Sequence, residues 1–271
     1  MEIKNKRLVI SFVINIIIII LFISSVILEI IDIQNNPSSV YKNVWGLFRF
    51  FTIDGNLFST ICCIILVINQ IRAMKNKDKI EIQKKILISH CNYMIGLMSA
   101  CTDFIIFIVV MLVLFPLSGK SGVELINTYK ASSLHITNPI LLNVRFLLFD
   151  TRERDLPIYE KFFGGIPMFT YGIILSILCA SKAFTGYGDV GDGNIPYPFL
   201  DFYHQNPLIS VFGVLFVLII GFAFSVLLDF LNKKLDQKVL PYDFDEIKEL
   251  KDIKEIPYVG EVVVDNESNN K

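Results

Sequence analysis

The chain alternates between long apolar stretches and short polar connections. A helix rises about 1.5 Å per residue and the hydrocarbon layer is about 30 Å thick, so one crossing needs about 20 predominantly apolar residues. Six stretches reach or nearly reach that length, and they run from Leu8 to Ile33, Leu47 to Ile71, Ile86 to Leu117, Leu134 to Phe149, Gly165 to Phe184 and Pro207 to Leu231. The pattern predicts an all-α, polytopic membrane bundle with six transmembrane helices.

The basic residues of the connections predict the orientation, because Lys and Arg near helix ends are held on the cytoplasmic side. Basic residues precede the first stretch and follow the second, fourth and sixth, whereas the fifth connection, Thr185 to Asn206, contains none. Both termini are therefore predicted to be cytoplasmic. The fourth stretch is the shortest and most polar, and if it only dips into the membrane, every later segment changes side.

The composition changes after residue 232. Residues 1–232 form the predicted six-helix transmembrane domain, and residues 233–271 form a mixed-charge segment that ends in NESNNK. Such a segment carries too little apolar surface to fold alone, so a partly disordered cytoplasmic tail is predicted.

Composition narrows the class of protein further. The chain is 53% hydrophobic with a formal charge of -1 and a mean hydropathy of +0.56, and these values indicate a multi-pass membrane protein. We expect it in the cell (plasma) membrane, with membrane lipids as its partners. Without a basic surplus, nucleic acid is not an expected partner. The five cysteines all lie in apolar stretches without C-x-x-C spacing, so they are expected to be packing residues. We expect neither a metal nor an organic cofactor.

Three polar clusters open or precede apolar stretches, where polar side chains are costly and therefore informative. They contain Thr52, Asp54 and Asn56 in RFFTIDGN, His135 and Asn138 in LHITNP, and Tyr197 and Asp201 in IPYPFLDFYH. With the predicted topology, all three clusters lie in or near the outer leaflet and can converge on one site.

A hydroxyl beside an imidazole is the minimal nucleophile and general base for acyl transfer. Thr52 and His135 are the candidates for these two roles. The residues that would orient the imidazole or stabilise an oxyanion are Asp54, Asn56, Asn138, Tyr197 and Asp201. The alternative is that Thr52 bonds back to a carbonyl of its own helix and His135 is an interfacial residue with its tip in water.

Two charged residues lie deeper in the apolar stretches. Asp103 is near the middle of the third stretch, and Arg145 lies about 15 Å from His135 along the fourth by the helical rise. We expect Asp103 and Arg145 to form one buried ion pair. The pair can fasten two helices or belong to a proton relay, and the first role is favoured because a single pair gives no continuous proton path across the membrane.

The polar clusters also carry a resemblance. The segments FFTIDGNLFSTICCIIL, TDFIIFIVVMLVLFP, LHITNPILLNVRFLLFD and IPYPFLDF resemble the bacterial Pr6Pr family of six-helix membrane proteins, in order over roughly residues 8 to 230. That family is similar, more distantly, to the eukaryotic androgen-induced membrane proteins, which hydrolyse fatty acid esters of hydroxy fatty acids with an intramembrane threonine and a histidine. By motif position, the resemblance implies that Thr52 is the nucleophilic threonine and His135 the histidine. The present sequence departs from the bacterial pattern at Asn143, Val144 and Arg145, where an acidic residue and a Trp are usual.

Three functional hypotheses follow from the residues and the resemblance. The first is an intramembrane lipid-ester hydrolase with a fatty-acyl ester substrate. The second is a noncatalytic transporter or binding protein for a lipid or small molecule, in which the outer polar clusters bind a head group. The third is a structural or assembly role, in which the basic connection from Arg72 to Lys85 contacts anionic lipid or a cytoplasmic partner.

Overall fold

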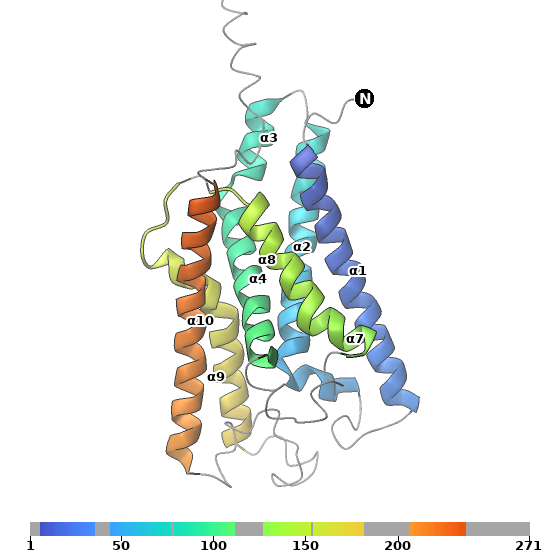
Figure 1. Ribbon diagram of the computed structural model, residues 1–271, viewed down its shortest axis with the longest axis vertical. Coiled ribbons are helices and arrows are strands. Elements are labelled where there is room, and N and C mark those ends of the chain that lie inside the picture. The colour runs from blue at the N-terminus through green and yellow to red at the C-terminus, as the bar shows by residue number, and fades with distance from the viewer. Residues whose placement is uncertain are drawn as a thin grey trace, which may run out of the picture.

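The structure is a computed structural model that describes residues 6–35, 44–76, 79–111, 127–152, 154–181 and 206–236. The regular elements within these ranges are all helices, with no strand among them, which confirms the all-α fold (Figure 1). The predicted site residues Tyr197 and Asp201, and the tail from residue 237 onwards, lie outside the described residues.

Each apolar stretch corresponds to a helix or a run of helices. The five long helices are α1 (Lys6–Asn35), α2 (Phe51–Lys75), α4 (His90–Val109), α9 (Ile166–Ala180) and α10 (Pro207–Asp236). The shorter elements are η1 (Val44–Arg49), α3 (Ile80–Leu87), α7 (Tyr129–Ser132), η4 (Ser133–Thr137), α8 (Asn138–Phe149) and η5 (Glu160–Gly165). α7, η4 and α8 follow one another without a gap and form one long helical run.

Successive helices alternate in direction when the run from α7 to α8 is counted between α4 and α9 (Figure 1). α1 begins, and α10 ends, at the end of the bundle where α3 lies, which we call the α3 end. α1 ends, and α2 begins, at the opposite end, where α7 lies, which we call the α7 end. The two polar clusters of the described residues therefore belong to the α7 end, because one opens α2 and the other lies just after α7.

The centre of the bundle is α4, which packs against α2, α8, α9 and α10. Its Leu97, Ala100 and Cys101 are completely buried. The small side chains on α4 allow neighbouring helices to approach it closely. Gly55 of α2 also allows a close approach to α4, because a Cβ there would lie 2.7 Å from Ile106 Cδ1. Such small-residue contacts are typical of helix packing in lipid, where no hydrophobic driving force holds the helices together.

The outer surface of the bundle is apolar. On α10, Phe212 is 68% exposed and Ile219 is 66% exposed, and on α1 Ile20 is 58% exposed. A soluble monomer rarely exposes contiguous apolar surface of this kind, and lipid tails cover it without cost.

Five described helices are long and apolar enough to cross a membrane, and they are Arg7–Asn35, Phe51–Lys75, Glu81–Val109, Glu160–Cys179 and Pro207–Leu235. The predicted fourth span is not among them. The run from α7 to α8 is helical throughout, but its polar residues, including His135, Asn138 and Arg145, lower its hydropathy. The described helices therefore support a membrane protein with several spans, and the sixth crossing stays a prediction.

Helix boundaries differ from the apolar stretches at two places. The predicted third stretch is divided at Ser89, whose side chain accepts a hydrogen bond from the backbone N–H of Asn92 and so caps the start of α4. The predicted domain boundary at residue 232 falls inside α10, which continues to Asp236. The positions beyond residue 232 are helical because Lys233 and Lys234 lie in the last turn, where cations interact favourably with the helix dipole.

Candidate active site

The first turn of α2 meets the η4 turn through Asn56, which is 1% exposed. The Asn56 Nδ2 group donates to the carbonyl of Thr52 at 2.7 Å and to the carbonyl of Leu134 at 3.0 Å. Asn138 Nδ2 in turn donates to Asn56 Oδ1 at 3.2 Å. One side-chain amide thus bonds the backbone of Thr52 and the residue immediately before His135, so the structure brings the first two polar clusters together.

η4 is a π-helical turn, in which the backbone N–H of Asn138 donates to the carbonyl of Ser133, five residues earlier. Pro139 supplies a physical reason for this wide turn. A proline has no N–H for the carbonyl four residues before it, here His135, and its ring collides with that carbonyl in a regular α-helix. Single π-helical turns of this kind occur frequently at functional sites, and this one contains His135.

The His135 imidazole has an unused buried nitrogen. Its Nδ1 atom has no hydrogen-bond partner in the described part of the chain, although buried polar atoms are nearly always paired. A neutral imidazole with a free ring nitrogen can accept a proton or bind a ligand.

Thr52 is half-buried in the first turn of α2. Within the described ranges its hydroxyl makes no hydrogen bond with His135, so the two candidate residues are linked only indirectly, through Asn56 and the carbonyls of Thr52 and Leu134. Catalytic hydrogen bonds are often long or poorly aligned in a free enzyme and tighten only when the substrate binds.

Asp54 lies on a different face of α2. Two residues along a helix correspond to a rotation of about 200°, which points Asp54 away from the face that Thr52 and Asn56 share. Its side chain lines a separate cavity together with residues of α9. The prediction that Asp54 orients the His135 imidazole therefore has no support from its position.

The predicted ion pair between Asp103 and Arg145 is not formed. Arg145 donates from Nη1 and Nη2 to the two carboxylate oxygens of Asp150, both at 2.9 Å. Asp103 accepts a hydrogen bond of 2.7 Å from the Ser59 hydroxyl instead. The prediction was wrong because the chain turns at the end of α8 and brings a nearer carboxylate back to Arg145.

The Arg145–Asp150 pair occupies space left by a glycine. A Cβ at Gly96 of α4 would lie 1.9 Å from Asp150 Oδ2, so the carboxylate rests directly on the α4 backbone. Asn232 of α10 adds two hydrogen bonds of 2.9 Å, from its Nδ2 to the carbonyls of Phe146 and Asp150. The pair therefore joins α4, α8 and α10 at the α3 end.

A second charged cluster at the α3 end surrounds Asp229 of α10, which is 1% exposed. Its carboxylate accepts a hydrogen bond of 2.8 Å from the Tyr93 hydroxyl and lies 3.2 Å from Arg152 Nη1 and 3.7 Å from Lys161 Nζ. The Arg152 guanidinium also lies over the Tyr93 ring, 5.4 Å from its centroid. Sequence analysis missed this cluster, and the signal was an isolated acidic residue in the last apolar stretch together with the basic residues from 152 to 161.

The described residues contain no group of three or more His, Cys, Asp or Glu side chains that could hold a metal ion. Comparisons with models of known families, with curated proteins and with solved structures gave no match. The fold and the apolar outer surface are those of a helical integral membrane protein.

Proposed function

We propose that the chain spans the plasma membrane six times, with both chain termini on the cytoplasmic side. The alternating direction of the helices supports this proposal, because α1 begins and α10 ends at the α3 end. The basic side chains of Arg72, Lys84, Lys85 and Lys233 belong to helix ends or short elements at that end, as the rule for cytoplasmic Lys and Arg requires. The run from α7 to α8, the fourth span along the chain, would complete the six crossings, with Arg145 neutralised by Asp150.

We further propose that the chain is an intramembrane lipid-ester hydrolase, with Thr52 as nucleophile and His135 as general base. The observation that carries the proposal is the Asn56 amide, which bonds the carbonyls of Thr52 and Leu134 at once. The unpaired Nδ1 of His135 and the resemblance to six-helix Pr6Pr proteins add support. A buried hydrogen-bonded amide that fixes two chain segments is a suitable frame for such a pair.

The reaction would proceed by two acyl transfers. The Thr52 Oγ1 atom attacks the acyl carbon while His135 takes the hydroxyl proton, and His135 returns that proton to the departing alkoxide. Water then attacks the acyl-threonine with His135 again as base, which releases the fatty acid and restores Thr52. Asn56 and Asn138 are positioning residues in this scheme, because their Nδ2 groups are already used in bonds within the protein.

The substrate would reach the site from the bilayer. Neighbouring positions on α8 face outward with apolar side chains, since Ile140 is 47% exposed and Val144 is 40% exposed. An ester with long acyl chains can approach along this face without leaving the hydrocarbon layer. This favours a lipid ester over a small water-soluble ester.

The test is hydrolysis of a fatty acid ester of a hydroxy fatty acid by purified protein in nonionic detergent. The proposal predicts that Thr52→Ala and His135→Ala each lower the rate by about 10²-fold or more, as expected for loss of a nucleophile or general base. Matched controls are Thr137→Ala in the same turn and His90→Ala in α4, which should leave the rate unchanged. Equal rates for the wild type and the two site variants would refute the proposal.

A second candidate, a transporter or binding protein, is favoured by Asp103. Its side chain is fully buried, Oδ2 has no hydrogen-bond partner, and no described cation forms an ion pair with it. An unpaired carboxyl inside a membrane is a typical feature of ion and proton pathways. Uptake into proteoliposomes that is lost in Asp103→Asn but retained in Thr52→Ala would favour this candidate over the hydrolase.

A further inference from the structure

A cavity of about 410 Å³ lies between α2, α4 and α9, and its size falls within the range of about 300–1,000 Å³ usual for ligand pockets. The side chains that line it are mostly apolar and include Phe58, Met98, Pro167 and Ile174. The α9 wall faces outward, since Ile166 is 39% exposed and Ile174 is 53% exposed. A ligand dissolved in the bilayer can therefore enter the cavity from the side.

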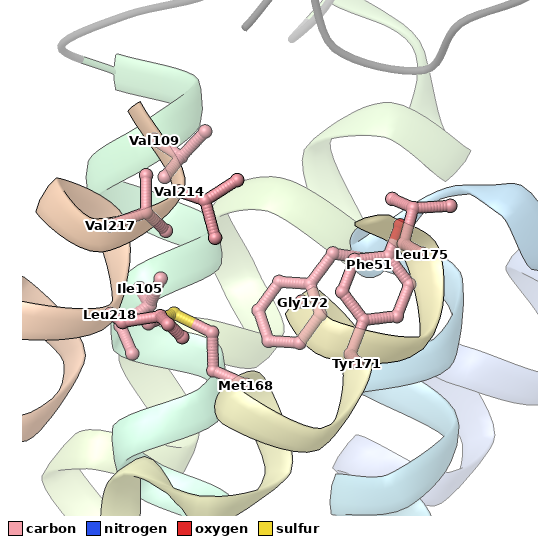
Figure 2. Close-up of a pocket in the computed structure, with 10 residues that line it drawn as sticks. All are labelled: Phe51, Ile105, Val109, Met168, Tyr171, Gly172, Leu175, Val214, Val217 and Leu218. Atoms are coloured by element: carbon pink, nitrogen blue, oxygen red, sulfur yellow. The ribbon is translucent and has the colours of Figure 1, made fainter. Parts of the chain in front are cut away.

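A second, smaller cavity of about 60 Å³ lies deeper, between α2, α4, α9 and α10. Figure 2 shows the rings of Phe51 and Tyr171 side by side at one side of it, and Val214, Val217 and Leu218 of α10 at the other. Phe51 and Tyr171 also line the larger cavity, and their ring centroids are 4.9 Å apart. This aromatic pair is thus the shared wall between an outer groove and an inner apolar cavity.

Among the described residues that line these two cavities, Asp54 is the only one with a charged side chain. It is half-buried, and within the described residues it makes no ion pair and no hydrogen bond through its carboxyl group. The charges at the α3 end, by contrast, have near partners. A carboxylate in low-dielectric surroundings gains most from a ligand of opposite charge.

We propose that the groove binds a single-chain amphiphile with an ammonium head group, such as a long-chain alkylamine. The ammonium group pairs with Asp54, the alkyl chain lies along α9, and its end reaches the inner cavity past Phe51 and Tyr171. One chain is expected because the inner cavity has room for the end of only one. The site is independent of the proposed hydrolase, since Asp54 lies on a different face of α2 from Thr52.

The test uses hexadecylamine that carries a photoreactive diazirine at the end of its chain, with the matching hexadecyl sulfate as the control of opposite charge. Both probes are added to the full chain in nonionic detergent, and the crosslinked peptides are located by mass spectrometry. The amine is expected to label the linings of the inner cavity on α9 and α10. Asp54→Asn should lower this labelling by about tenfold or more, while Asp54→Glu should retain it.

A second variant tests the path of the chain. A Cβ at Gly172 would meet Leu218 Cδ2 at 3.5 Å, which is ordinary contact, so Gly172→Ala should fit and Gly172→Leu should fill the inner cavity. Gly172→Leu is expected to move the crosslinks out of the inner cavity, and Ile177→Phe on the outward face of α9 should leave them in place. Equal labelling by the sulfate, or labelling that is unchanged in Asp54→Asn, would overturn the proposal, because ordinary lipid chains would then fill the groove.

Discussion

Two acidic side chains at the α3 end are paired, whereas two polar groups near the proposed sites at the α7 end are not, in the part of the chain that the structure describes. At the α3 end, Asp150 and Asp229 each have a basic partner and further hydrogen bonds. At the α7 end, the His135 Nδ1 atom and the Asp54 carboxyl group have no partner within the described residues. The paired groups stabilise the contacts between helices, whereas the unpaired groups are available to a substrate or ligand. We therefore expect the pairs of Asp150 and Asp229 to stabilise the bundle, and we propose that His135 and Asp54 serve its function.

The largest effect on stability is expected from Asp229→Ala. The substitution leaves Arg152, Lys161 and the Tyr93 hydroxyl without their shared partner, and removal of one member of a buried ion pair costs about 3–5 kcal/mol of unfolding free energy. Reversible unfolding by sodium dodecyl sulfate in mixed micelles measures this quantity. Asp155→Ala is the matched control, because Asp155 is 67% exposed and solvent screens its ion pairs, so its loss should change the unfolding free energy little. Equal losses in both variants would remove the distinction between buried and exposed pairs.

A smaller loss is expected from Gly96→Ala. The new methyl group would lie 1.9 Å from Asp150 Oδ2, so the Arg145–Asp150 pair must shift, at an expected cost of about 1–3 kcal/mol. Gly172→Ala is the comparison in an open position, where alanine should be neutral or slightly stabilising because it favours the helix. If the two alanine variants unfold at the same denaturant concentration, the close contact of Asp150 with α4 is not as described.

Thr52→Ala is expected to change stability by less than about 1 kcal/mol, since the hydroxyl makes no hydrogen bond within the described residues. The same unfolding assay applies, and Asn56→Ala is the neighbouring comparison. Asn56→Ala should cost about 1–3 kcal/mol because it leaves buried groups of Asn138 and Leu134 unpaired. A Thr52→Ala protein as unstable as Asn56→Ala would indicate that Thr52 serves the fold.

The smallest effect is a shift in one pKa. The hydrogen bond from Lys233 Nζ, 2.7 Å from Asp155 Oδ2, holds the pKa of the Asp155 carboxyl below its ordinary value. A lowered folded-state pKa stabilises the fold above the unfolded pKa, and this contribution is lost as the pH falls through the folded value. Lys233→Gln should raise the pKa of Asp155 toward its ordinary value of about 4, measured by NMR titration of ¹³C-labelled aspartate. An unchanged titration would show that the lysine does not hold this carboxylate.

The helices could be predicted from the sequence because their apolar stretches are long. The first stretch, predicted from Leu8 to Ile33, becomes α1 from Lys6 to Asn35, and the last begins at Pro207 as predicted. In lipid, the backbone must satisfy its own hydrogen bonds, so apolar length alone predicts a helix. The closeness of Asn56 to the turn before His135 also agrees with the common depth expected for the two clusters.

The partners of the charges could not be predicted, because they depend on contacts between distant helices. Arg145 binds Asp150 only because the chain turns after α8 and Gly96 leaves room for the carboxylate. Asn15 and Gln70 are a similar case, since the sequence shows each amide within an apolar stretch but not that their buried bond of 3.1 Å joins α1 to α2. Asp54 is a different case, because it lies two residues after Thr52. In a helix this separation alone puts Asp54 on a different face of α2 from Thr52.

The most direct test locates the covalent adduct of an alkyl fluorophosphonate on the purified protein by mass spectrometry. If the unpaired groups at the α7 end carry the function, the adduct lies on Thr52 in the wild type and is absent from the His135→Ala protein. An adduct on another side chain, or labelling of Thr52→Ala at the wild-type rate, would contradict the proposed roles of Thr52 and His135.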